Sequence, residues 1–257
     1  MNATQHDGIE AFALLLANAQ DANRLLPALD PTQVPVDAGQ AYAVQHRILA
    51  LRGQALRGWK VGAKSASGGP IQGAPLPADR VLSSPATVQR SAFATLGLEL
   101  EIAFRFGRVF EPSAQPYSEA EVFAGIGSML ATIEVVSSRY PGWPAVDKLA
   151  QLADLQNHGA LAVGEAIAYA ADFPFEAPAA SFRFDGVDIV KGRPANPAGD
   201  PRRLLVWLVN HATSRGLTIG KDIVVTTGSY TGMHFPERPG TAIGEIEGLP
   251  AVRLAVA

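Results

Sequence analysis

The stretch LELEIAFRF, residues 98–106, alternates apolar side chains with others and therefore has the period of a β-strand. Side chains of a strand point alternately to opposite faces, so one face is wholly apolar and the other carries Glu99, Glu101, Ala103 and Arg105. Two neighbouring carboxylates repel each other, which raises the pKa of at least one unless a cation lies between them. The alternative is that both glutamates lie on a solvent-exposed face, with Arg105 as a surface partner.

A third acidic residue, Glu134, stands in the apolar, β-branched run ATIEVVSSRY, residues 131–140. A lone carboxylate in such a run is costly to bury unless it is paired. If Glu99, Glu101 and Glu134 converge, they form an oxygen site suited to Mg²⁺ or Mn²⁺. The alternative for Glu134 is a buried salt bridge to Arg139.

The chain around these glutamates divides into a helical start and a β-rich remainder. Helical spacing covers residues 8–26 and 38–52, and short β-rich segments separated by Gly and Pro begin at Gly58. We therefore expect a small helical N-terminal region over residues 1–57 and a mostly β catalytic domain over residues 58–257.

A capping box marks the start of a helix after the first long strand. Ser118 and Glu121 have the S-x-x-E spacing, and apolar residues follow at helical spacing as far as Ile133. The pattern predicts that a packed helix precedes Glu134.

The C-terminal half shows further turn and helix signals. The Asp-Gly pair at residues 185–186 predicts a two-residue hairpin, and a Pro start with a Gly stop predicts a helix over residues 200–216. Strands are expected over residues 222–227 and on both sides of residues 248–250.

Composition excludes several classes of function. The 257 residues are 47% hydrophobic and 18% charged, which is typical of a folded protein, and 21 Lys+Arg against 24 Asp+Glu without a basic cluster argue against nucleic acid as a partner. Cysteine is absent, so thiolate nucleophiles and cysteine-based metal sites are excluded. The apolar run near the N-terminus is interrupted by Glu10 and no run reaches about 18 residues, so we expect a cytoplasmic protein with no membrane partner.

Known nucleotide and hydrolase motifs are also missing. The chain has no H-E-x-x-H, no G-x-S-x-G, no P-loop and no intact G-x-G-x-x-G sequence. Nucleotide-cofactor and serine-hydrolase functions therefore lack support.

Three other segments carry candidate functional groups. Lys60 in GWKVG is an ammonium in an apolar segment, which can orient a substrate anion or move protons, although it could also be a surface lysine on an edge strand. The turn TTGSYTG, residues 226–232, lets N–H groups and hydroxyls approach an anion, or is an ordinary loop. His158 is either a proton carrier or a structural residue. The residues of the turn that we expect to bind substrate are Thr227, Gly228, Ser229 and Thr231.

In this order along the chain, GWKVG, LELEIAF, IEVVSSRY, ADLQNHGALAVG and DIVVTTGSYTG resemble the fumarylacetoacetate hydrolase superfamily, specifically its 2-keto-4-pentenoate hydratase and 2-oxo-3-hexenedioate decarboxylase branch. The resemblance implies an α+β fold, a mixed β-roll with a small helical N-terminal part. It also implies a Mg²⁺ or Mn²⁺ ion held by Glu99, Glu101 and Glu134. Lys60 would be a catalytic lysine facing the substrate and Asp154 a second catalytic group. Residues 63–84 would form a lid over the site.

A metal held by three glutamates can take the carboxylate and the C2 oxygen of a 2-oxo acid and stabilise an enolate at C2. The leading hypothesis is a hydratase that adds water to a 2-hydroxydienoate and gives a 4-hydroxy-2-oxo acid. The alternatives are a 2-oxo-3-enedioate decarboxylase, an acylpyruvate-type C–C hydrolase and a non-catalytic metabolite-binding homologue. We also expect a homo-oligomer with a small-molecule substrate and a role in aromatic catabolism.

The choice between hydratase and decarboxylase depends on the charges around the pocket. A 2-oxo-3-enedioate has a second carboxylate, which calls for a cation at the far end of the site. Arg139 has the wrong strand parity to face the metal, and Lys64 lies in a Gly- and Ser-rich loop; Lys148 and Lys191 are the other candidates. We therefore expect a substrate with one carboxylate and a neutral tail.

Overall fold

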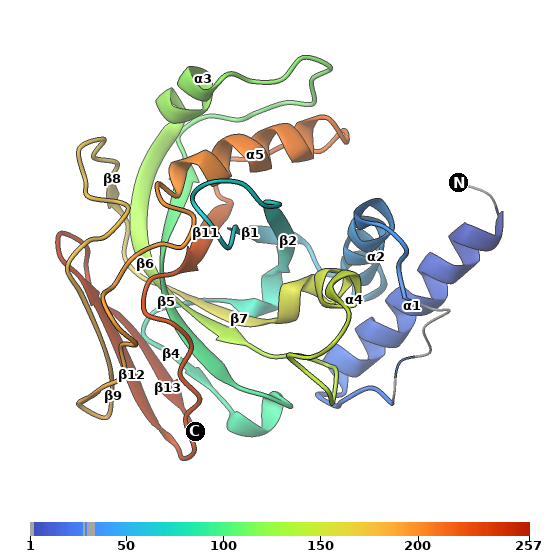
Figure 1. Ribbon diagram of the computed structural model, residues 1–257, viewed down its shortest axis with the longest axis horizontal. Coiled ribbons are helices and arrows are strands. Elements are labelled where there is room, and N and C mark those ends of the chain that lie inside the picture. Colours follow the sequence, from blue (N-terminus) through green and yellow to red (C-terminus); the bar gives the residue numbers. More distant parts are fainter. Residues whose placement is uncertain (1–2, 28, 30–33) are drawn as a thin grey trace.

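Strand β5, Gly97–Phe106, lies in the middle of the larger of two β-sheets (Figure 1). It pairs antiparallel with β6, Ile126–Val136, on one side and with β11, Val224–Ser229, on the other. The computed structural model describes residues 3–27, 29 and 34–257. The predicted strand over residues 98–106 is confirmed.

The larger sheet has the order β2-β1-β11-β5-β6-β7-β3, with β8 attached to β6. Strands β1 and β11 run parallel, as do β3 and β7, while the other pairs are antiparallel. The sheet is therefore mixed. Its remaining strands are β1 Leu56–Gly62, β2 Gln72–Pro77, β3 Val81–Ser83, β7 His158–Val163 and β8 Ile167–Ala168.

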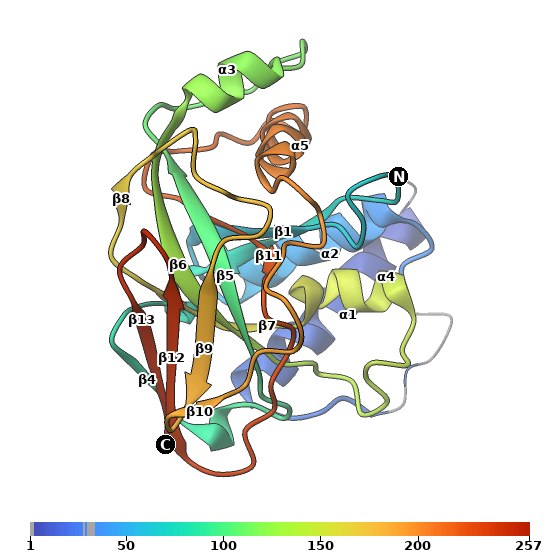
Figure 2. The same ribbon diagram turned by 60° about the vertical axis from the view of Figure 1, so that its left-hand side comes forward.

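The smaller sheet covers the apolar face of β5 (Figure 2). Leu98, Leu100 and Ile102 are fully buried and share one core with Phe182 and Leu254 of the smaller sheet. This sheet has the order β10-β9-β12-β13-β4. Its strands are β4 Ala86–Val88, β9 Ala180–Phe184, β10 Val187–Asp188, β12 Gly240–Ile246 and β13 Val252–Val256.

The opposite face of β5 lines the inside of a curled sheet. Ala103 packs in a second cluster with Leu76, Leu130, Leu161 and Val224, which come from β2, β6, β7 and β11. Residues from distant strands can meet in this way only if the larger sheet bends around them. Glu99 and Glu101 lie on this inner face.

Helices α1, α2 and α4 pack together in a third cluster, on the right in Figure 1. Helix α2 starts at the N-cap Asp37, which accepts a hydrogen bond of 2.8 Å from Gln40 N. The helices are α1 Ala3–Asp21, α2 Ala38–Leu51, α3 Glu119–Ala124, α4 Lys148–Ala153 and α5 Arg202–Thr213, with 3₁₀ turns η1 Ala78–Arg80, η2 Arg90–Ala92 and η3 Leu155–Asn157. Among the described helices, none is long and apolar enough to cross a membrane.

The prediction of a long helix after the capping box is wrong. The capping box of Ser118 and Glu121 is present, but α3 ends at Ala124 and the apolar residues as far as Ile133 belong to β6. Strand β6 is buried on both faces over most of its length, so its sequence shows no alternation, and a continuous apolar run can match a helical spacing by chance. Glu134 therefore lies within a strand and not after a helix.

The other predicted elements agree with the structure. The hairpin at residues 185–186 joins β9 and β10, α5 lies within residues 200–216, and β12 and β13 flank residues 248–250. The expected α+β class, a mixed β-roll with a small helical N-terminal part, is confirmed. The boundary between residues 57 and 58 lies inside strand β1. The division into a region of residues 1–57 and a domain of residues 58–257 stays a proposal.

Candidate metal centre

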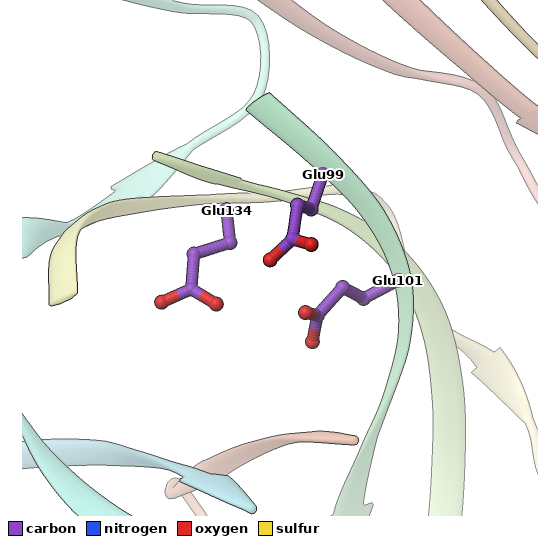
Figure 3. Close-up of side chains that lie close together, drawn as sticks. All are labelled: Glu99, Glu101 and Glu134. Carbon is purple, nitrogen blue, oxygen red and sulfur yellow. The ribbon is translucent and has the colours of Figure 1, made fainter. Parts of the chain in front are cut away.

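Three glutamates meet on the inner face of the larger sheet (Figure 3). Glu99 and Glu101 are two residues apart on β5, and Glu134 on β6 is the cross-strand partner of Glu99. One carboxylate oxygen from each lies within 4.8 Å of those of the other two. Glu101 and Glu134 are only 2% and 1% exposed, so the interpretation of a solvent-exposed glutamate face is wrong for Glu101.

Strand β11 holds the carboxylate of Glu101. The hydroxyl of Thr226 and the backbone N–H of Gly228 both donate to Glu101 Oε2, the latter over 2.9 Å. Gly228 has a φ of +95°, a backbone conformation that favours glycine. The strand thereby fixes the direction of one carboxylate toward the other two.

Glu134 is held by two nitrogen groups. Lys60 Nζ on β1 lies 2.6 Å from Glu134 Oε1, and His158 Nδ1 on β7 lies 3.1 Å from the same oxygen. The alternative of a salt bridge between Glu134 and Arg139 is wrong, because Arg139 pairs with Asp154.

The pKa values of the cluster follow from burial and mutual charge. Burial, together with the neighbouring Glu134, raises the pKa of Glu99 to about 7 and that of Glu101 to about 8. Burial also acts against ionisation of Glu134, but Lys60 and His158 hold its pKa below the ordinary value. For Lys60, burial alone would lower the pKa, yet the charges of Glu134 and Glu101 raise it, so the ammonium stays protonated.

The cluster fits a hard divalent cation. Among the described residues, three converging carboxylates meet the ammonium of Lys60, and burial together with the charge of Glu134 raises the pKa values of Glu99 and Glu101. Carboxylate oxygens are the ligands that Mg²⁺ and Mn²⁺ prefer. Assignment of the three glutamates as metal ligands is a proposal that this geometry supports.

Asp154 lies in a buried ion pair beside the cluster. Arg139 Nε is 2.6 Å from Asp154 Oδ1, Arg139 N donates to Oδ2 over 3.1 Å, and Gln20 Nε2 donates to Oδ1 over 3.5 Å. Asp154 is fully buried. Both oxygens thus accept hydrogen bonds from protein donors, and a catalytic role of Asp154 stays a prediction.

The residues after Asp154 form a left-handed turn that contacts Lys60. Leu155, Gln156 and Asn157 have φ values of 47°, 51° and 59°. Non-glycine residues in this region are strained, and such strain is held where surrounding contacts impose it. Gln156 O accepts a hydrogen bond of 3.2 Å from Lys60 Nζ, so the turn helps to orient the ammonium.

The four residues expected to bind substrate have different roles. Thr227 Oγ1 donates to Ile102 O over 2.7 Å, and Thr231 Oγ1 accepts from Leu100 N over 3.4 Å, so both hydroxyls are bound to β5. Gly228 binds Glu101 as described. Ser229 is half-buried, and its hydroxyl lies close enough to the Glu99 carboxylate to act as a hydrogen-bond partner that lowers the pKa of that group.

A cavity of about 550 Å³ opens onto Lys60. Its lining includes Gln156 and two further lysines, Lys64 and Lys148, as well as the Gly- and Ser-rich segment after Lys60. The expected lid segment, residues 63–84, thus contributes its first part to this cavity. No acidic side chain is among the described residues that line it.

Sequence patterns missed several of these groups. Thr226 belongs to the hydroxyl-rich turn, but only the pairing of β5 with β11 shows that it, and not Thr227, meets Glu101. The Gln156 carbonyl is a backbone group in an irregular turn, which no side-chain pattern reveals. His158, whose role the sequence left open, is a partner of Glu134.

Comparisons with known proteins identify relatives in sequence and in fold. No family model matches the chain. It is 26% identical over 256 residues to the 2-keto-4-pentenoate hydratase of Burkholderia vietnamiensis (strain G4 / LMG 22486), an alignment that covers 96% of this chain and 97% of that protein.

Among solved structures, 4-oxalocrotonate decarboxylase from Pseudomonas putida G7, complexed with magnesium and adipate, matches with a TM-score of 0.85 at 19% identity and covers 98% of both chains. The 2-hydroxyhepta-2,4-diene-1,7-dioate isomerase from Mycobacterium marinum matches with a TM-score of 0.58 at 16% identity, over 79% of this chain and 76% of that one. The shared fold and the aligned relative confirm the resemblance noted from the sequence. The chain is thus similar in sequence to a 2-keto-4-pentenoate hydratase and in fold to 4-oxalocrotonate decarboxylase, which is the resemblance noted from the sequence.

Proposed function

We propose that the protein is a divalent-metal-dependent lyase that adds water to a 2-hydroxydienoate and gives a 4-hydroxy-2-oxo acid. The observation that carries the proposal is the cluster of Glu99, Glu101 and Glu134 with Lys60 at its edge, since Lys60 also lines a cavity large enough for a small acid. The aligned hydratase relative supports the same class of reaction.

The three glutamates would hold the metal, which supplies positive charge for the carboxylate and C2 oxygen of the substrate. Thr226, Gly228 and His158 keep two of these carboxylates in place before substrate arrives. Such fixed orientation avoids reorganisation during the reaction.

Lys60 is the group best placed to move protons. In the hydration of 2-hydroxypenta-2,4-dienoate, the enol proton leaves the C2 oxygen, protons are added at C5 and C3, and the oxygen of water bonds to C4. Lys60 Nζ, held by Glu134 and by the Gln156 carbonyl, faces the cavity and would deliver or receive one of these protons.

The test is a direct assay. The purified protein with Mg²⁺ and 2-hydroxypenta-2,4-dienoate should remove the dienoate absorbance and form 4-hydroxy-2-oxopentanoate, whereas a chelator should stop the reaction. If the dienoate is inert while 2-oxo-3-hexenedioate releases CO₂, the protein is a decarboxylase. Cleavage of an acylpyruvate would identify a C–C hydrolase, and inactivity on all three with retained binding would identify a metabolite-binding homologue.

A further inference from the structure

Strand β11 carries one extra residue opposite β5 where it passes the three glutamates. Thr226 pairs with Ala103 and Ser229 pairs with Glu101, so three positions on β11 lie opposite two on β5. Such a β-bulge interrupts the ladder of hydrogen bonds and redirects backbone groups. The N–H of Gly228, inside the bulge, is the backbone group that donates to Glu101 Oε2 over 2.9 Å.

The side chain of Asn196 lies against this bulge. Its Nδ2 donates to Thr227 O over 2.9 Å and, at the longer distance of 3.5 Å, to Gly228 O. A Cβ atom on Gly228 would lie 4.0 Å from both polar atoms of the Asn196 side chain. The pairing of β11 with its other neighbour, β1, ends at Thr226. Asn196 therefore supplies a hydrogen bond to a buried carbonyl at the point where the ladder is interrupted.

The orientation of the Asn196 amide is fixed by its other contacts. Ala198 N donates to Asn196 Oδ1 over 2.9 Å, and because a backbone N–H can only donate, the amide nitrogen faces the bulge. Asn196 is 6% exposed, and its own backbone N donates to Glu176 O over 2.8 Å. The preceding residue, Ala195, donates from its N–H to Tyr230 O over 3.1 Å. The segment before α5 is thus bound to β11 on both sides of Gly228.

One peptide plane connects Asn196 with Glu101. The carbonyl of Thr227 and the N–H of Gly228 belong to the same planar trans peptide, so they point in opposite directions. Asn196 binds the carbonyl on one side, and the N–H on the other side donates to Glu101 Oε2. A rotation of this peptide would break both hydrogen bonds together.

We infer that Asn196 is a positioning residue for Glu101 and acts through the peptide between Thr227 and Gly228. The inference rests on the proposed function for the role of Glu101 as a metal ligand. It deepens that function by naming a residue outside the glutamate cluster that sets the affinity for the ion. Loss of a group that orients a metal ligand commonly lowers metal affinity about 10- to 100-fold.

Calorimetric titration of the full-length protein with Mg²⁺ and with Mn²⁺ tests the inference. Asn196→Ala removes the side-chain contacts, whereas Asn196→Asp keeps an acceptor for Ala198 N but cannot donate to the bulge. Each should weaken binding of both ions about 10-fold. For Asn196→Asp the loss should occur in spite of the added negative charge, which by itself would attract the cation.

Asn210 provides the matched control, because its Nδ2 also donates to a backbone carbonyl, that of Tyr117, over 3.0 Å. Asn210→Ala and Asn210→Asp should bind both ions as wild type does. Wild-type affinity in the two Asn196 variants, or an equal loss in the Asn210 variants, overturns the inference.

A double variant tests the route through the peptide. Gly228 has a φ of +95°, so Gly228→Ala should disturb the same peptide and weaken metal binding. Asn196→Ala combined with Gly228→Ala should then bind Mg²⁺ no more weakly than the weaker single variant, since both changes remove one hydrogen bond to Glu101. Additive losses would show that Asn196 acts by another route and would overturn the inference.

Kinetics separates the inference from the proposed reaction. The Mg²⁺ concentration that gives half the maximal rate of dienoate hydration should rise in the Asn196 variants by the factor measured in calorimetry, and saturating Mg²⁺ should restore kcat. If the dienoate is inert but the variants bind Mg²⁺ more weakly than wild type, the proposed hydratase fails and the inference stands. A decrease in kcat that saturating Mg²⁺ does not restore, at wild-type metal affinity, contradicts the positioning role.

Discussion

Lys60 Nζ lies 2.6 Å from Glu134 Oε1, and this pair joins β1 to β6 across the inside of the curled sheet. The lysine side chain is 14% exposed and the glutamate side chain 1%. Lys60 therefore contacts a fully enclosed carboxylate and also lines the cavity. Its positive charge neutralises part of the negative charge of Glu99, Glu101 and Glu134.

The first prediction concerns Lys60. Lys60→Met should lower kcat by a factor on the order of 10² to 10⁴, the usual range for a positioned proton-transfer group, because no other described lysine contacts Glu134. Steady-state kinetics and calorimetric Mg²⁺ titration check this, and metal binding should persist. A kcat within a few-fold of wild type would show that Lys60 only supports the fold.

The second prediction concerns metal binding. Glu101→Gln should abolish calorimetrically detectable Mg²⁺ and Mn²⁺ binding, since two remaining carboxylates compete poorly with water for a strongly hydrated ion. Glu165→Gln, at an exposed position, is the control and should bind metal as wild type does. Unchanged affinity in the Glu101 variant would contradict the assignment of the three glutamates.

The third prediction is a loss of stability at alkaline pH in the absence of metal. The pKa values of Glu99 and Glu101 are raised to about 7 and about 8, from an ordinary value of 4.5, so the folded state binds these protons more tightly than the unfolded state. Their contribution to stability is complete below the unfolded pKa and is lost as pH rises through 7 and 8.

The Tm of chelator-treated protein should therefore fall between about pH 5.5 and about pH 8.5. Glu101→Gln should show a shallower decrease, and Mg²⁺ should raise the wild-type Tm most at the upper end of this range. A parallel decrease in wild type and variant would show that Glu101 does not carry the effect.

The fourth prediction tests the role of Asp154. Asp154→Asn breaks a buried ion pair with Arg139 and should destabilise the protein by about 3–5 kcal/mol in chemical denaturation. Glu245→Gln, which removes the partner of Arg183 in an exposed pair, should cost less than about 1 kcal/mol. Loss of kcat at unchanged stability would instead support a catalytic Asp154.

The sequence alone determined much of the local structure around the site. Alternation in residues 98–106 placed Glu99 and Glu101 on one face of a strand, and Asp185-Gly186 fixed a hairpin, because both patterns depend only on neighbouring residues. The cost of burying an unpaired carboxylate also made Glu134 a candidate partner of the other two. These inferences hold because period and turn geometry are local properties of the backbone.

Only the tertiary structure decided how distant segments meet. The apolar run before Glu134 fits a helix and a fully buried strand equally well, and pairing along the whole of β5 selected the strand. Likewise, the tertiary structure pairs Arg139 with Asp154 and Lys60 with Glu134. It also places Lys64 and Lys148 in the lining of the cavity that Lys60 lines. The partner of a charge depends on which strands and helices lie side by side, and that choice is made by the packing of the entire chain.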